Sequence, residues 1–144
     1  MIYIIGSLAN PKIPEIEKLL RASGFNVFAQ WHAAGEHADE EWQKYFKYHG
    51  INLRDALKSA FVQNGFQFDK KHIDEADTVV VIAPFGKSGG IELGYAVGQG
   101  KHSYILFPNG DPERYDMMLA WADDIFYNLD ELMSKLRGDQ MRKR

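Results

Sequence analysis

The feature that most constrains the fold of this chain is a near-continuous apolar run over residues 78–84. A strand without polar alternation needs cover on both faces, which is typical of a central strand in a parallel sheet. A glycine-rich loop and a helical stretch follow the run. The residues that indicate them are Gly86, Ser88, Gly89 and Gly90 for the loop, and Ile91, Tyr95, Ala96 and Val97 for the helix. The sequence therefore predicts a buried strand, a loop at its carboxyl end, and a helix that starts there.

Strands and helices alternate along the rest of the chain. We expect strands at 2–5, 26–30, 103–107 and 125–126. We expect helices at 14–23, 40–48, 53–63, 68–75, 90–99, 113–122 and 129–136, with a loop at 32–39. This alternation implies a parallel sheet with right-handed crossovers. The prediction is an α/β fold: one flavodoxin-like, doubly wound domain over 1–136, with a five-stranded parallel sheet and helices on both faces. A polar, basic, frayed tail follows at 137–144.

Composition excludes several classes of function. The net charge of −3 gives no electrostatic case for binding a nucleic-acid polymer. The absence of cysteine excludes disulfides, thiol nucleophiles and cysteine metal sites, and the five histidines lack metal-ligand spacing. We find neither a signal peptide nor a membrane span, so we expect a cytoplasmic protein that needs no metal.

Glu92 is the residue most informative about function. It lies near the predicted start of a helix, just beyond the carboxyl end of a central strand, where open α/β sheets bind ligands. The glycines before it let a ligand approach the backbone, and Ser88 can cap the helix. A plainer explanation is that Glu92 only complements the helix dipole. Position alone does not separate the two.

The glycine-rich loop matches neither common nucleotide-binding motif. A phosphate-binding Walker loop needs its lysine at the helix entry, whereas Lys87 precedes Gly89 and Gly90. A dinucleotide fingerprint belongs after the first strand. The loop can still hold an anion or a sugar hydroxyl through backbone N–H groups.

Asp69 is a second candidate for a functional residue. The simpler explanation is that it is a solvated residue on a helix.

One pattern joins Tyr3 in the first strand, Asp69 upstream of the central strand, and the block from Ile91 to Lys101. With these residues the chain resembles the nucleoside 2-deoxyribosyltransferases, a superfamily that includes the 2′-deoxynucleoside 5′-monophosphate N-glycosidases. The likeness runs from Ile2 to about Leu132. Its most specific part is Glu-Leu-Gly-Tyr-Ala, starting at Glu92, with the Gly-Lys pair downstream.

The resemblance implies roles for three residues. Glu92 would be the nucleophile that attacks the anomeric carbon and holds the sugar as an ester. Tyr3 would hydrogen-bond Glu92 and orient it, and Asp69 would exchange a proton with the base. A nucleophilic carboxylate and a proton-donating carboxyl group follow the logic of retaining glycoside hydrolysis, and their pKa values should be pushed apart.

The resemblance also implies substrate contacts. The sugar would meet the loop after the central strand, the base would face the second strand's end, and the 5′ end would meet a residue of a neighbouring subunit. The residues of this chain predicted to contact the substrate are Gly6, Ser7, Gln30, Trp31, His32, Ser88, Gly89, Gly90, Asp116 and Met118.

Two departures from the family pattern favour a nucleoside over a nucleotide. The nucleotide hydrolases carry Ser-Ile-Arg after the first strand, but this chain has Ser7, Leu8 and Ala9. The phosphate-binding cation is therefore missing unless Lys12 or Lys87 replaces it. An aspartate at position 116 would accept a hydrogen bond from a 5′-hydroxyl and repel a phosphate.

Three functions follow as hypotheses. The first is transfer of deoxyribose from a 2′-deoxynucleoside to another nucleobase or to water, without a cofactor, by a homodimer or homotetramer with shared active sites. The second is hydrolysis of a 2′-deoxynucleoside 5′-monophosphate. The third, of another class, is a nucleoside- or nucleotide-binding protein without catalysis.

Overall fold

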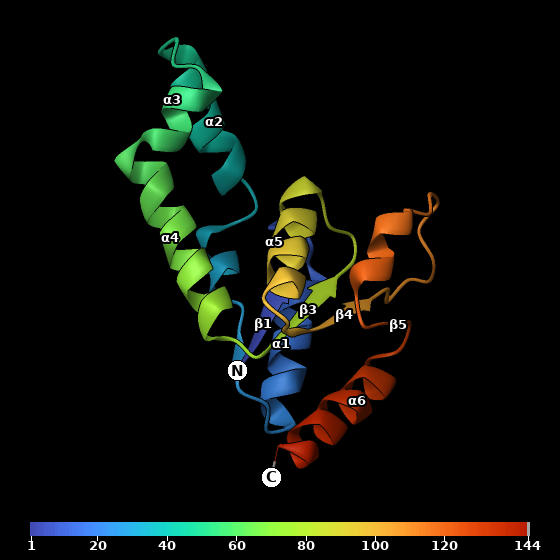
Figure 1. Cartoon of the computed structure of the whole chain (residues 1–144). Helices are drawn as coiled ribbons and strands as arrows, with labels where there is room; N and C mark the ends of the chain where they lie inside the picture. The colour runs from blue at the N-terminus through green and yellow to red at the C-terminus, as the bar shows by residue number, and fades with distance from the viewer. Residues whose placement is uncertain (144) are drawn as a thin grey trace.

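A computed structural model describes residues 1–143 as an α/β fold around a five-stranded, all-parallel sheet. The strand order is β2-β1-β3-β4-β5 (Figure 1). The strands are β1 (Ile2–Ile5), β2 (Val27–Phe28), β3 (Thr78–Ile82), β4 (His102–Leu106) and β5 (Asp124–Phe126). The predicted flavodoxin-like, doubly wound architecture is confirmed, and every residue of the central strand β3 is buried.

Side-chain alternation along the strands divides the core into two layers. On one face, Ile4 and Val80 pack with apolar residues of α1 (Lys12–Ala22) and α6 (Leu129–Arg142). On the other face, Tyr3 and Val79 pack with residues of α5 (Lys87–Gly98) and of the end of α4 (Ala60–Glu75). Successive strand residues point to opposite faces, so a one-residue shift of β1 would take Tyr3 away from α5.

The direction of the strand order reverses between β1 and β3, which lie side by side with Tyr3 opposite Val79. The loops after these two strands leave in different directions, which creates the crevice where such sheets bind ligands. Asn10 is buried and joins the two loops, because its side-chain amide donates to the carbonyl of Ala83 at 3.2 Å. A Cβ at Gly6 would lie 2.5 Å from Ile13 Cδ1, so a larger residue here would have to displace the end of that side chain.

A helical arm extends beyond the sheet. It comprises α2 (Ala38–Tyr48), α3 (Leu53–Lys58) and the first part of α4, and we refer to residues 38–66 as the arm. Figure 1 shows these helices, in green, standing away from the sheet, while the far end of α4 returns to it. A 3₁₀ turn, η1 (Gln30–Ala34), connects β2 to the arm where we expected a loop.

Helix boundaries in the middle of the chain differ from the prediction. The expected helices at 53–63 and 68–75 are divided instead at Ser59, whose extended backbone and side chain cap α4 by accepting from Val62 N–H. The helix α4 then runs through Gly65, since one glycine costs an exposed helix only about 1 kcal/mol. The prediction that Ser88 caps a helix was also wrong. The helix α5 begins at Lys87 after Gly86, and no side chain caps it.

The predicted frayed tail is helical over most of its length. The helix α6 continues to Arg142, because Asp139 is buried and accepts a hydrogen bond from the Tyr104 hydroxyl. Lys143 pairs with Asp77 at the start of β3, and Arg144 lies outside the described residues. The expected helix at 113–122 shrinks to one 3₁₀ turn, η2 (Met117–Trp121).

Among residues 1–143, no helix combines the length and the apolar character that crossing a bilayer requires.

Candidate active site

Glu92 lies in the second turn of α5, on the side of the helix that packs against the sheet. Its neighbour Leu93 is buried, and the Glu92 side chain is itself largely covered. The carboxylate oxygen Oε2 is buried and has no hydrogen-bond partner within residues 1–143. The helix-dipole explanation does not fit this position, because the dipole acts mainly over the first turn of a helix. A buried carboxylate without a partner costs stability and therefore needs another reason to be there.

Tyr3 points from β1 toward α5, and only 1% of its surface is exposed. Burial raises the pKa of its hydroxyl above the usual range, and the charges of Glu92 and then Asp69 raise it further. Both carboxylates are therefore close enough to act on one phenol. The structure brings together the three residues that the resemblance linked.

Asp69 reaches this group from α4, beyond the arm. The pKa of its half-buried carboxyl group is raised, first by burial and then by Asp39 of α2, while His72 lowers it. The His72 ring stacks on Phe28 with ring centres 3.8 Å apart, and it lies 4.5 Å from the ring of Phe68. These rings give the side of the site next to Asp69 an apolar, planar wall.

Burial raises the pKa of Glu92 to about 7. The nearby Tyr3 hydroxyl opposes this shift, and the charge of Asp69 adds to it. The environment raises the pKa of both carboxyl groups, and that of Glu92 reaches about 7. Near neutral pH, Glu92 is poised between its two forms.

A cluster of polar side chains, the α4–α5 clamp, joins the two helices that carry the acids. Asp74 of α4 accepts hydrogen bonds from Tyr95 of α5 at 2.5 Å and from Gln99, the residue after α5, at 3.0 Å. Lys70 pairs with Asp74 at 2.9 Å, and Lys101 donates to the carbonyl of Asp74 at 3.1 Å. Hydrogen bonds from Tyr95, Lys70 and Gln99 hold the pKa of Asp74 far below its usual value, so the Asp74 carboxylate stays ionised.

The clamp lies one to two turns from the acids. Tyr95 follows Glu92 by three residues on α5, and Asp74 follows Asp69 by five on α4. The clamp therefore fixes the position of one acid relative to the other. In the sequence, Tyr95 has no predicted role beyond the motif. Asp74, Asp39 and His72 carry no sequence signal, since their contacts depend on how α2, α4 and α5 are arranged.

The loop and helix start before Glu92 remain open to a ligand. Ser88 and Gly90 are exposed in the first turn of α5, while Gly89 is buried against Phe85 and Ile5. A Cβ at Gly89 would lie 3.1 Å from Phe85 Cβ and 3.3 Å from Ile5 Cγ2. Glycine therefore lets α5 begin close to the sheet, which brings Glu92 down toward Tyr3. Gly6 and Ser7, at the end of β1, lie across the same crevice.

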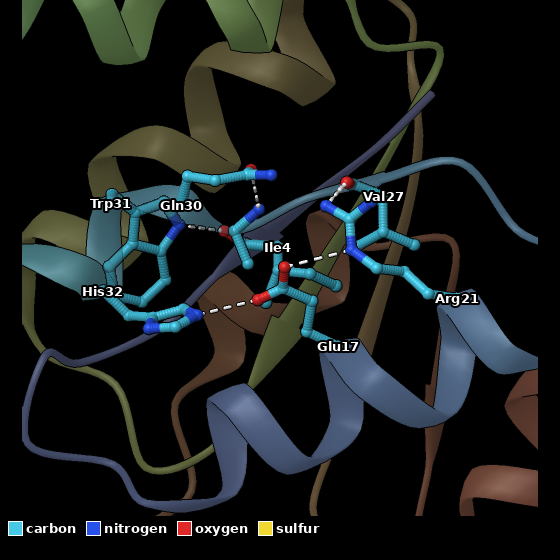
Figure 2. A network of polar contacts seen from close by, with 8 residues as sticks. Ile4, Glu17, Arg21, Val27, Gln30, Trp31 and His32 are labelled. Carbon is cyan, nitrogen blue, oxygen red and sulfur yellow. Dashed lines mark hydrogen bonds and ion pairs between the residues drawn. The ribbon is translucent and has the colours of Figure 1, made fainter.

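The residues expected to face the base are occupied by contacts within the chain (Figure 2). The indole N–H of Trp31 donates to the carbonyl of Ile4 at 2.8 Å, and His32 pairs with Glu17 at 2.7 Å. The side-chain oxygen of Gln30 accepts from the N–H of Ala29 at 3.1 Å. These groups tie η1 to β1 and α1. A base can meet the Trp31 ring, but recognition by His32 would require it to leave Glu17.

Asp116 and Met118 lie at a different edge of the crevice. Asp116 lines a hollow of about 460 Å³ at the carboxyl ends of β3 and β4, together with Phe85, Phe107 and Arg114. Met118 is exposed in η2, and its N–H donates to the Asp116 side chain. Tyr3, Asp69 and Glu92 do not line this hollow, so the structure does not bring Asp116 and Met118 into direct contact with the acids.

Comparisons with known proteins do not identify a family for this chain. Neither a family model nor a curated protein matches it. No three His, Asp or Glu side chains among residues 1–143 converge so as to hold a metal ion.

The contact between Tyr3 and Glu92 yields a first testable outcome. Since the Tyr3 hydroxyl lowers the pKa of Glu92, Tyr3→Phe should raise that pKa above about 7. Carboxyl ¹³C NMR titration of Glu92 measures this directly, with Tyr104→Phe, on the opposite face of the sheet, as the matched control. An unchanged or lower Glu92 pKa in Tyr3→Phe would show that the two groups do not interact.

Proposed function

We propose that this protein cleaves the N-glycosidic bond of 2′-deoxynucleosides and transfers the deoxyribosyl group to another nucleobase or to water. The observation that carries the proposal is the buried Glu92 carboxylate, whose Oε2 has no partner, beside Tyr3 and Asp69. The resemblance to the nucleoside 2-deoxyribosyltransferases supports the choice of substrate. Two carboxyl groups and a phenol can perform the whole reaction without a cofactor.

The first half of the reaction forms a covalent intermediate. An oxygen of the Glu92 carboxylate attacks C1′ of the sugar and forms an ester bond. The C1′–N bond breaks, its electron pair stays on the base nitrogen, and Asp69 donates a proton to the base. Burial of Asp69, which raises its pKa, favours the protonated form that this step requires.

The second half reverses these events with a new acceptor. A nitrogen of the incoming base attacks C1′, Asp69 removes the proton from that base, and the ester bond breaks to regenerate the Glu92 carboxylate. Water can replace the base, and the outcome is then hydrolysis. Tyr3 donates its hydroxyl hydrogen toward Glu92 in both halves and so keeps the carboxylate oriented.

The attack requires ionised Glu92, so kcat/KM should rise as pH increases through about 7.

One observation favours a second candidate, hydrolysis of a 2′-deoxynucleoside 5′-monophosphate. Arg114 lines the hollow that also contains Asp116. It could supply the cation for a 5′-phosphate that the run of residues 7–9 after β1 lacks. The two aspartates of that hollow, Asp111 and Asp116, oppose an added negative charge. A nucleoside therefore remains the better substrate.

Chromatography of the protein incubated with deoxyinosine or thymidine plus free adenine tests the proposal. A new deoxynucleoside establishes transfer, and free base without a new nucleoside establishes hydrolysis. The same assay with the monophosphates decides between the two candidates. If neither nucleosides nor monophosphates are consumed while calorimetry shows that they bind, the third hypothesis, a binding protein without catalysis, replaces both.

Glu92→Gln separates the role of Glu92 in catalysis from its effect on stability. The variant should lose turnover because an amide cannot form the ester. It should also be more stable than the native protein at alkaline pH. The Glu92 carboxyl ionises at about 7 in the folded protein but at 4.5 as an ordinary side chain, so its stability contribution falls as pH rises between these values. Removing the buried charge should raise the free energy of unfolding by up to about 3 kcal/mol above this range.

The control for this experiment is Glu131→Gln, an exposed change in the first turn of α6. Turnover and thermal melting should both match the native protein in the control. Residual turnover in Glu92→Gln would contradict the covalent mechanism. A loss of stability in Glu92→Gln at alkaline pH would contradict the description of Glu92 as a destabilising buried carboxylate.

Tyr95→Phe tests the α4–α5 clamp as a positioning element. The variant keeps the ring but loses the hydrogen bond to Asp74, so Asp69 should move relative to Glu92. We expect kcat to fall about tenfold with little change in KM, because misplaced reacting groups slow the chemistry more than they weaken binding. Tyr104→Phe, which loses a bond to Asp139 instead, should reduce stability and leave kcat unchanged. An equal loss of kcat in both variants would show that the clamp has no specific role in positioning the two acids.

A further inference from the structure

A continuous group of aromatic rings connects the sheet to α4. Tyr3 of β1 stacks on Phe28 of β2, with ring centres 5.5 Å apart and planes 19° from parallel. The His72 ring of α4 stacks on Phe28, with centres 3.8 Å apart and planes 13° from parallel. Phe68, one turn before His72, ends the group, and its ring is tilted by 58° against Phe28 and by 56° against His72. The group therefore runs from the phenol beside Glu92 to one flank of α4.

Phe68 is the exposed member of this group, yet its position is fixed by contacts. Phe28 is 7% exposed, whereas Phe68 is 49% exposed. The Nδ1 atom of His72 lies 2.8 Å from the carbonyl oxygen of Phe68, and because a carbonyl only accepts, Nδ1 is the donor. This bond and the stacking on Phe28 hold the imidazole ring, which in turn supports the Phe68 ring. The exposed side of Phe68 is thus held in place before a ligand arrives, which reduces the ordering cost of binding.

The turn of α4 that carries Asp69 has two flanks with different partners. The clamp side chains of α4 lie on the flank next to α5. Phe68 and His72 are four residues apart and share the opposite flank. Asp69 lies between the flanks, on the same side as Ile73, which is buried against the sheet. Asp69 therefore has the helix of Glu92 on one side and the Phe68 ring on the other.

The order of these groups matches the order of the parts of a nucleoside. In the proposed reaction Glu92 meets C1′ of the sugar, and Asp69 meets a nitrogen of the base. The rest of the base is a flat ring that extends away from the sugar. Beyond Asp69, the site offers the flat ring of Phe68. Aromatic side chains bind bases by stacking, and they tolerate different bases because each has a π-face.

We propose that the exposed side of Phe68 is the platform on which the nucleobase stacks, and that His72 holds this platform in position. The inference rests on the proposed function, for which it names the main contact of the base. Gln30, Trp31 and His32 are less suited to this role, because their polar groups are engaged within the chain. A bicyclic base overlaps the ring more than a monocyclic one does, so purines gain more from Phe68 than pyrimidines.

Calorimetric titration of the Glu92→Gln protein with deoxyinosine tests the platform, because this variant should bind the nucleoside without consuming it. Adding Phe68→Tyr should leave the affinity nearly unchanged. Adding Phe68→Leu keeps an apolar side chain but removes the flat ring, and it should raise Kd about tenfold. Phe61→Leu is the matched control, since Phe61 lies seven residues earlier on the same flank of α4 and is 65% exposed. The control should bind deoxyinosine as tightly as its parent.

The separate parts of the substrate show which contact is lost. Free adenine should lose affinity in Phe68→Leu by about the same factor as deoxyinosine. Binding of 2-deoxyribose, followed by NMR through the amides of Gly89 and Gly90, should not change. In the chain with native Glu92, Phe68→Leu should raise KM about tenfold and leave kcat nearly unchanged, because stacking acts alike on the bound substrate and on the transition state.

The possible failures of the inference and of the proposed function differ. Deoxyinosine that binds equally well to Phe68→Leu would overturn the inference and leave the proposed reaction intact. An equal loss of affinity in Phe61→Leu, or an equal loss for 2-deoxyribose, would also overturn it, because the substitution would then act on the fold and not on the base. A native protein that neither binds nor converts any deoxynucleoside would overturn both.

Discussion

The burial of the Glu92 carboxylate is the constraint on which the rest of this structure depends. An ionised group with an unpaired oxygen is unfavourable in a protein interior, and burial raises the pKa of Glu92 for the same reason. The fold tolerates it because the five-stranded sheet, packed on both faces, supplies stability elsewhere. Gly89 lets α5 approach the sheet, and the residue that follows one turn later is placed against Tyr3. Local backbone chemistry thus sets the electrostatics of the site.

The arrangement of the two acids depends on a second set of contacts. Asp69 and Glu92 come from helices separated by the central strand, and the sheet alone does not determine the distance between them. The hydrogen bonds from Tyr95 and Gln99 to Asp74 join α4 to α5 near the acids. The helix α4 also forms the base of the arm, so the arm and Asp69 are joined by one continuous element.

Much of this could be predicted from the sequence, for physical reasons that differ between the parts. The apolar run that became β3 has no polar face, so it had to be central, and the parallel sheet with its crossovers followed from the alternation of elements. Glu92 was found because a glycine-rich loop after such a strand marks the crevice. Three features escaped prediction. Ser59 rather than Gly65 divides the middle helices, Asp139 extends α6 through a contact with Tyr104, and Trp31 and His32 bond to β1 and α1. The α6 extension and the Trp31 and His32 contacts depend on partners distant in sequence, which local propensity does not contain. The Ser59 cap is a local contact with Val62 N–H, whereas the gap between the helices was expected around Gly65.

The central claim is that Glu92 carries the sugar as a covalent ester. The most direct measurement is mass spectrometry of protein quenched during reaction with a 2′-deoxynucleoside in the absence of an acceptor base, followed by trypsin digestion. Cleavage after Lys87 and Lys101 places Glu92 in one peptide, residues 88–101. The account predicts that this peptide gains the mass of one deoxyribosyl group, with fragmentation that assigns it to Glu92. Turnover with no label on this peptide, or with the label on Asp69, would contradict the account.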